Sequence, residues 1–197
     1  MKTKYIVIGI LLVLVVIGLW FAGQYNAFVS LDQETKNAWA QVENQYQRRY
    51  DLVPNLVETV KGVAAQEQAV YLGVAEARAK VGQMQISPET FRDPVAFKQF
   101  EAAQGEFSSA ISRLLVTVEN YPVLKSNENF LALQTQLEGA ENRISVERKR
   151  FNDAAMAYNK KAKGVPGVWL ASMFGMEKEK QMFEAVVGTE QPPQVKF

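Results

Sequence analysis

An unbroken apolar stretch opens the sequence: every residue from Tyr5 to Ala22 is aliphatic, aromatic or glycine, and the first charge beyond it is Asp32. As a helix with a rise of 1.5 Å per residue, this stretch measures ~27 Å, close to the thickness of the hydrocarbon core of a bilayer. We therefore predict a transmembrane anchor over residues 1–25, in which residues 5–22 contact lipid.

A cleavable signal peptide is the alternative, because the stretch is N-terminal and follows Lys2 and Lys4. Its apolar run is longer than the usual core of such a signal, and no A-x-A-like cleavage site follows it. The two lysines precede the span, whereas Lys36 is the first basic residue beyond it. Because basic residues stay on the cytoplasmic side, we expect a cytoplasmic amino terminus and an extracytoplasmic body.

Beyond the anchor, apolar residues recur at alternating steps of three and four, the spacing of a helix that presents one face to a core. The clearest stripe includes one glutamine and comprises Phe97, Phe100, Gln104, Phe107, Ile111, Leu114, Val118 and Tyr121. A looser stripe includes one arginine and comprises Phe28, Thr35, Ala38, Val42 and Arg49. No strand pattern competes. The stripes predict helices near residues 26–50, 54–84, 94–120 and 127–163.

Short connections between long amphipathic helices imply that neighbouring helices are antiparallel. The predicted fold is therefore all-α, with a single N-terminal transmembrane helix followed by an antiparallel up-down four-helix bundle. The bundle occupies residues 26–187 and includes a short C-terminal helix. Residues 188–197 contain two prolines and are predicted to form a disordered tail.

Capping residues mark two of the helix starts. Asp93 precedes Pro94, which combines a capping oxygen with a residue whose missing N–H costs nothing in the first turn. Ser126 can cap the last long helix in the same way.

The boundary between the first two helices is the least defined, and it depends on Pro54. This proline either follows a reversal at residues 51–53 or only kinks a continuous helix. We favour the reversal because it gives segments of similar length that can pack side by side. The continuous alternative is a rod of ~85 Å whose second half is poorly covered. The reversal would place residues 48–55 at a turn far from the membrane.

A second apolar segment, residues 168–174, follows Gly164 and Pro166, which terminate the last long helix. One interpretation, which we favour, is that four residues close the open end of the bundle core: Trp169, Leu170, Met173 and Phe174. The other is that the segment lies in the membrane interface, because lysines flank it on both sides.

Composition excludes most catalytic chemistry. The chain has 22 basic and 21 acidic residues, so no net charge attracts nucleic acid. It has neither cysteine nor histidine, which removes thiol nucleophiles, disulfides, the commonest general base and the commonest transition-metal ligand. A carboxylate-bridged dimetal site would need Glu-x-x-His spacing, and no glycine lies in a phosphate-binding motif. We therefore predict that the protein is not an enzyme and holds no metal or cofactor.

The residues also resemble a known family. Residues 38–42 and the stretch RRYDLVPNLVETVKG at residues 48–62 look like the signature of the LemA family of bacterial membrane proteins. Further matching segments are Ala75–Arg78, Tyr121–Pro122, Leu137–Ile144, Arg148–Asn152, Tyr158–Asn159 and Phe183–Glu184. The resemblance implies one transmembrane helix and an antiparallel four-helix bundle in the bacterial inner membrane, with no established enzymatic activity. Some members are encoded beside membrane metalloproteases, which hints at a membrane-protein partner.

A helical body without a catalytic site, held on an anchor, predicts a scaffold or adaptor for another membrane protein. The alternative is a ligand-sensing extracytoplasmic bundle that acts through a separate signalling partner. No pattern predicts the oligomeric state. The candidate interaction residues are Arg48, Arg49, Asp51, Pro54, Asn55, Trp169 and Phe174.

Overall fold

The structure is a computed structural model that describes residues 2–62, 66–84, 90 and 92–184. All regular secondary structure in these residues is helical, which confirms the predicted all-α class. The helices are α1 (Lys2–Lys61), α2 (Gln68–Gly82), α3 (Pro94–Val118), α4 (Pro122–Lys125), α5 (Glu128–Lys163) and α6 (Gly167–Met173). The predicted disordered tail, residues 188–197, lies outside the described residues.

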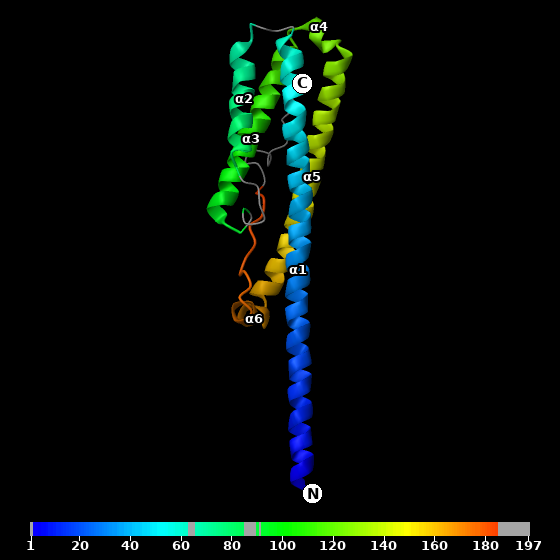
Figure 1. The fold of residues 1–197 in the computed structure, drawn as a ribbon, viewed down its shortest axis with the longest axis vertical. Coiled ribbons are helices and arrows are strands. Elements are labelled where there is room, and N and C mark those ends of the chain that lie inside the picture. The colour runs from blue at the N-terminus through cyan, green and yellow to red at the C-terminus, as the bar shows by residue number, and fades with distance from the viewer. Residues whose placement is uncertain (1, 63–65, 85–89, 91, 185–197) are drawn as a thin grey trace, which may run out of the picture.

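One long helix organises the molecule. The lower part of α1 stands alone, and its upper part lies beside α2, α3 and α5 (Figure 1). Among the described residues, α1 is the one helix long and apolar enough to cross a membrane, and no residue of its most apolar stretch is buried. We call the part above the lone segment, residues 26–184, the body.

The predicted reversal before Pro54 is wrong, because α1 runs through this proline without a break. Proline lacks an N–H, so the carbonyl oxygen of Tyr50 loses its partner within the helix. Arg78 of α2 supplies a replacement: its Nε donates to this oxygen at 3.3 Å, and its guanidinium carbon lies 3.8 Å from the centroid of the Tyr50 ring. The helix therefore tolerates Pro54, and α2 docks where the helical bond is missing.

The first turn of the body follows Lys61 instead. The N–H of Gly62 still donates to the carbonyl of Glu58 at 3.2 Å, and α2 begins at Gln68. Because α1 takes the residues that were assigned to the second helix, α2 covers only 68–82 of the predicted 54–84.

The two predicted caps have different outcomes. Asp93 caps α3 as expected: its carboxylate accepts from the N–H of Val95 at 2.8 Å, and Pro94 is the first helical residue. For α5, however, the cap is Asn127 rather than Ser126. The Asn127 side chain accepts from the N–H of Phe130 at 3.1 Å, and α4 occupies the residues just before it.

The body consists of two close helix pairs, α1 with α5 and α2 with α3, whose backbones approach each other most extensively. Between the pairs the backbones stay further apart, and we call this space the seam. Large side chains fill it, because only they can reach across. Its middle holds an aromatic cluster of Trp39 from α1, Phe97 and Phe100 from α3, Phe151 from α5, and Phe183.

The chain after α5 returns along the seam. α6 packs so closely on the end of α5 that a Cβ at Gly167 would lie 1.8 Å from the carbonyl oxygen of Lys161, so glycine is required there. Gly175, with a φ of 66°, ends the turn after α6. Residues 176–184, which we call the C-terminal segment, then run upward without regular secondary structure (Figure 1).

Candidate interaction site

A buried arginine connects the two helix pairs. Arg49 of α1 is only 1% exposed, and its Nη1 donates to Ser108 Oγ of α3 at 2.5 Å and to Glu141 Oε1 of α5 at 2.6 Å. Its Nη2 donates to the side-chain and backbone oxygens of Gln104. The guanidinium carbon also lies 5.2 Å from the ring centroid of Phe107. One cation therefore holds three helices in register, and we call Arg49, Gln104, Ser108 and Glu141 the Arg49 cluster.

A cleft of about 620 Å³ opens beside this cluster. Its lining comes from α1, α3, α5 and the end of the C-terminal segment, and includes Arg49, Gly105, Ser109, Glu141, Arg148 and Glu184. Two buried donors of lining residues, Arg49 Nε and Gln104 Nε2, have no hydrogen-bond partner among the described residues. Buried donors of this kind are normally satisfied, so these two atoms are an unmet polar demand of the Arg49 cluster.

Charges of both signs line the mouth of the cleft. Arg148 Nη2 lies 3.4 Å from Glu101 Oε1 and donates to the backbone oxygen of Glu184 at 3.2 Å, and its guanidinium covers the ring of Phe183. Burial raises the pKa of the Glu101 carboxyl, and the charge of Arg148 offsets part of that effect. The electrostatic potential at the mouth of the cleft is therefore of mixed sign.

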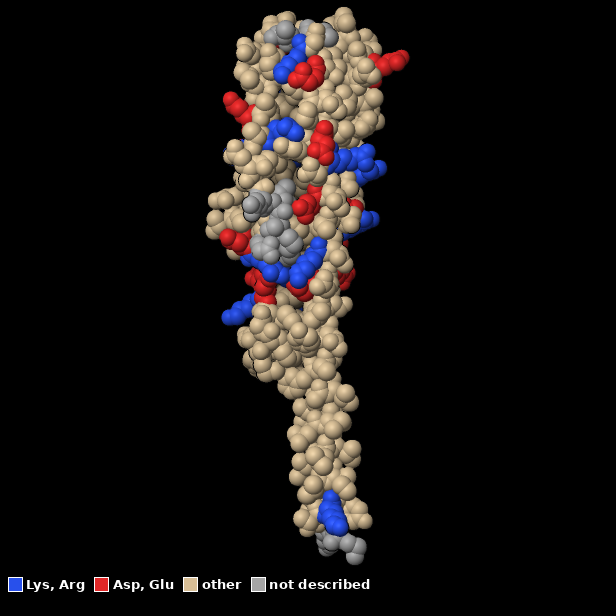
Figure 2. Space-filling view, viewed as in Figure 1, with Lys and Arg blue, Asp and Glu red and all other residues tan. Residues whose placement is uncertain are grey.

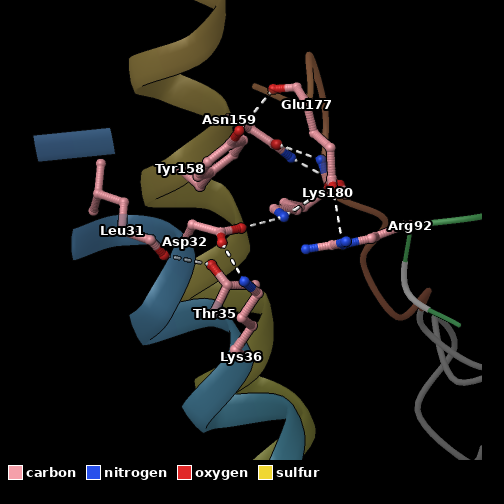
Figure 3. A network of polar contacts seen from close by, with 9 residues as sticks. All are labelled: Leu31, Asp32, Thr35, Lys36, Arg92, Tyr158, Asn159, Glu177 and Lys180. Carbon is pink, nitrogen blue, oxygen red and sulfur yellow. Dashed lines mark hydrogen bonds and ion pairs between the residues drawn. The ribbon is translucent and has the colours of Figure 1, made fainter. Parts of the chain in front are cut away.

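A second buried cation holds the C-terminal segment on α1 (Figure 3). The ammonium group of Lys180 lies 2.6 Å from Asp32 Oδ1 and 2.7 Å from Glu177 Oε2. Two further cations extend the network at its edges: Lys36 pairs with Asp32 at 2.7 Å, and Arg92 pairs with Glu177 at 2.6 Å. We call these five residues the Lys180 cluster. Because Lys180 is 1% exposed, loss of either carboxylate partner would leave a buried charge poorly compensated.

Two asparagines of α5 hold the backbone of the same segment. The side-chain amide of Asn159 donates to the carbonyl of Lys180 at 2.9 Å and accepts from its N–H at 2.7 Å. Asn152 forms the same pair of bonds with Phe183, both at 2.9 Å. The two asparagines are seven residues apart, hence on one face of the helix. They bind an extended chain through its peptide groups, and Phe183 adds a side chain buried in the aromatic cluster.

Two groups at the Lys180 cluster, the Asp32 carboxyl and the Tyr158 phenol, have shifted pKa values. Partial burial tends to raise the pKa of the Asp32 carboxyl, but hydrogen bonds and charges from Lys180 and Lys36 outweigh it, so the pKa is lowered. Burial, followed by the charges of Glu177 and Asp32, raises the pKa of the Tyr158 phenol to about 12. Tyr158 therefore stays protonated and donates to the backbone oxygen of Glu177 at 2.8 Å.

The structure does not bring the predicted residues 48–55 together as a binding turn, because they lie inside α1. Arg48, Asp51 and Asn55 are exposed, and the carboxylate of Asp51 accepts from Gln47, one turn earlier, at 2.8 Å. Pro54 is half-buried. Of this group, only Arg49 joins a site formed with other helices.

Trp169 and Phe174 occupy different environments. Phe174 is half-buried against Tyr25 and Phe28 of α1, with ring centroids 5.3 and 6.4 Å away. Trp169 is 67% exposed. Leu170 is buried, whereas Met173 is 61% exposed. Core closure is therefore correct for Leu170 and Phe174 and wrong for Trp169 and Met173.

Several residues of these clusters were not among the candidates from the sequence, including Gln104, Glu141, Asn159 and Lys180. For the Arg49 cluster a signal existed, because Arg49 and Gln104 both occupy positions in otherwise apolar stripes. A polar side chain in such a position must find a buried partner. No group of three or more potential metal ligands occurs in the residues that the structure describes.

Comparison with known proteins places this architecture in a family. A model of the LemA family matches residues 38–197. Relatives named as magnetosome proteins include MamQ of Magnetospirillum gryphiswaldense and MamQ 1 and MamQ 2 of Paramagnetospirillum magneticum. Each is 28% identical over 181 residues, which cover 84% of this chain and 66% of the relative, so the chain spans slightly less than two thirds of their length. Because the family model covers most of the sequence and includes all four residues of the Arg49 cluster, the chain belongs to the LemA family.

Proposed function

We propose that this protein is a single-pass membrane protein whose antiparallel four-helix bundle is a scaffold for another membrane protein. The observation that carries the proposal is the continuity of α1, which joins the apolar segment to the body in one helix of 60 residues. A helix without a break transmits the orientation of its anchor to everything packed on it. The body would thus be held at a defined height and angle above the bilayer.

The exposed apolar segment supports the membrane part of the proposal. Large apolar side chains between Tyr5 and Trp20 are each at least 45% exposed. A continuous apolar surface of that size is rare on soluble proteins and favours contact with lipid. The lysines before the segment favour a cytoplasmic amino terminus and an extracytoplasmic body.

The arrangement of the body supports the scaffold role. Buried charges and amide pairs fix the relative positions of its helices and of the C-terminal segment, which suits a rigid docking platform. The cleft beside Arg49 is the surface we assign to the partner, since its lining includes all four residues of the Arg49 cluster. It replaces the turn that the sequence predicted at residues 48–55.

Site-specific photo-crosslinking in native membranes tests the proposal. A photoreactive amino acid at Ser109, which is exposed and lines the cleft, is expected to capture one reproducible membrane protein. The same amino acid at Thr135, an exposed position of α5 outside the cleft lining, is the matched control and should not capture it. Absence of a reproducible adduct at Ser109, or equal capture at both positions, would refute the scaffold assignment.

A second candidate is a ligand-sensing bundle that acts through a separate signalling partner. The cleft of about 620 Å³ favours it, because hydroxyl and guanidinium groups in its lining, including those of Ser109 and Arg148, could bind a small molecule with a carbonyl or carboxylate. Thermal unfolding of the full chain in lipid nanodiscs, with a panel of small carboxylates and amides, tests this candidate. A compound that stabilises the wild type but not Gln104→Leu would support sensing over scaffolding.

A further inference from the structure

One face of α6 exposes apolar side chains beside the anchor. Gly167, Leu170 and Ala171 of this helix are buried against the body. The other side presents Trp169 and Met173, which are 67% and 61% exposed. Val168 in the helix and Val165 just before it are also exposed. This short helix therefore has a buried face and an apolar face that no other described element covers.

The exposed face lies next to the end of the predicted span. Phe21 and Phe174 pack against the same buried cluster as Leu170, and Tyr25 of α1 contacts Phe174. α6 is thus level with residues 21–28 of α1, directly after the stretch that ends at Ala22. Measured along the axis of α1, the apolar surface of the anchor therefore continues directly onto α6.

The distribution of charge defines how far this surface extends. Between Lys4 and Asp32 the helix α1 carries 27 residues without a charge, so Asp32 lies 28 residues further along the helix than Lys4. At 1.5 Å per residue the uncharged length is ~42 Å. That value exceeds the hydrocarbon core of ~30 Å, which about 20 residues of helix cross. Counted from Lys4, such a core ends near residue 24, so Tyr25 and Phe28, and α6 beside them, fall within the interfacial layer.

Figure 2 shows the same boundary on the surface. On the face shown, uncharged surface runs from the lone part of α1 over the bulge formed by α6, and a belt of charged residues begins above it. Lys160, Lys161 and Lys163 lie at the end of α5, immediately before α6. Lys161 donates to the side chain of Gln24, and Lys163 pairs with Glu179 at 2.6 Å. The exposed Lys160 can reach the phosphates of anionic lipids, as basic residues do at membrane surfaces.

We infer that α6 is a second membrane contact, with Val168, Trp169 and Met173 inserted among the headgroups and upper acyl chains of the leaflet next to the body. Large aromatic and apolar side chains with a basic flank are typical of helices that lie in this interface. The inference rests on the proposed anchor. The body would then touch the bilayer on the α6 side, and its lipid boundary would lie near Asp32 rather than at residue 25.

The absence of cysteine from the chain permits a direct test with single-cysteine variants of the full protein. Met173→Cys reports on α6, Leu14→Cys reports on the anchor, and Val116→Cys on α3 is the matched control, since Val116 is 62% exposed and Met173 is 61% exposed. Each variant is labelled with an environment-sensitive fluorophore and reconstituted into vesicles of phosphatidylcholine and phosphatidylglycerol. Quenching is measured with lipids that carry a nitroxide near the headgroup or near the end of the acyl chain.

We expect the label at Met173→Cys to be quenched several-fold more by the shallow nitroxide than the label at Val116→Cys. The label at Leu14→Cys should be quenched best by the deep nitroxide. Adding Val168→Ser and Trp169→Ser to the Met173→Cys variant should reduce the shallow quenching and leave anchor insertion unchanged. Both side chains are exposed, so the helical content measured by circular dichroism should not change.

Each contrary result has a distinct meaning. A deep signal at Leu14→Cys with water-like behaviour at Met173→Cys would overturn the α6 contact and leave the anchor intact. Water-like behaviour at Leu14→Cys would overturn the anchor itself. Protection of Met173→Cys in native membranes but not in vesicles would assign the face to a protein and overturn the lipid contact.

Discussion

Removing Glu141 should destabilise the body more than its partly exposed position suggests. The Glu141 side chain is 43% exposed, but its partner Arg49 is 1% exposed. Breaking a buried ion pair on one side costs about 3–5 kcal/mol, since a charge is left without compensation. Water can enter where the Glu141 carboxylate is removed, and Arg49 keeps its bonds to Ser108 and Gln104. We therefore expect Glu141→Ala to cost about 2–4 kcal/mol of unfolding free energy, below the upper end of that range.

The same reasoning predicts a partial rescue. In the double variant Arg49→Met and Glu141→Ala, no buried cation remains, and methionine fills much of the arginine volume. The remaining cost is the buried amide of Gln104, about 1–3 kcal/mol for an unsatisfied polar group. The double variant should consequently be more stable than Glu141→Ala alone by at least ~1 kcal/mol.

Urea unfolding of the full chain in detergent micelles, followed by circular dichroism, measures these differences. Glu138→Ala is the control, because Glu138 is exposed one turn earlier on α5 and bonds only to Gln134 among the described contacts, so its loss should change stability by less than about 0.5 kcal/mol. If Glu141→Ala costs no more than Glu138→Ala, or if the double variant is less stable than Glu141→Ala, the Arg49 cluster does not hold the helix pairs as described.

Three further outcomes follow from the other contacts. Arg78→Met should destabilise the wild type by roughly 1–2 kcal/mol, because it removes the donor to the Tyr50 carbonyl. It should cost much less in a Pro54→Ala background, where the new N–H of residue 54 can bond to that carbonyl. Equal costs in urea unfolding would contradict this account of Pro54. Asn159→Leu should expose the C-terminal segment to limited proteolysis, because it removes both bonds to the backbone of Lys180. The control Asn142→Leu, at an exposed position of α5, should not. Unchanged cleavage of Asn159→Leu would show that these two bonds are dispensable. Asp32→Asn should lower the free energy of unfolding at neutral pH, because it removes the ion pairs of the Asp32 carboxylate. These pairs stabilise the fold only while the carboxylate is ionised, so the difference from wild type should shrink as the pH falls through the lowered pKa of Asp32. A constant difference from pH 7 to pH 2 would exclude the pairing.

The sequence predicted the helical class and the long apolar helix near the amino terminus because both depend on local patterns. The apolar stretch needs no partner to be recognised, and the stripe from Phe97 to Val118 matches α3 closely. The capping pair Asp93 and Pro94 is equally local. Each of these signals lies within one helix or at its end, where spacing alone is informative.

The failures occurred where a distant residue decides the outcome. Pro54 should end a helix by local rules, but Arg78 restores the missing bond from a different helix, and no periodicity announces such a donor. The C-terminal segment could not be predicted for the same reason, because the amides of Asn152 and Asn159 recognise its backbone rather than its side chains. The Arg49 cluster lies between these cases: Arg49 and Gln104 stood out as polar members of apolar stripes, and only the structure shows that they bond to each other.

The height of the cleft constrains which partner a scaffold of this shape can hold. From Asp32, where the charged surface begins, to Arg49 beside the cleft is 17 residues of continuous helix, or ~26 Å at 1.5 Å per residue. A protein made only of membrane-spanning helices and short loops would not reach that far, so the partner must carry a substantial extramembrane segment on the same side. Crosslinks from Ser109 should therefore map to that segment, and crosslinks from Met173, close to the bilayer, should map to lipid or to residues at the end of a transmembrane helix. A crosslink from Ser109 to the interior of a transmembrane helix would mean that the rod is tilted strongly toward the membrane, and the rigid upright scaffold would have to be abandoned.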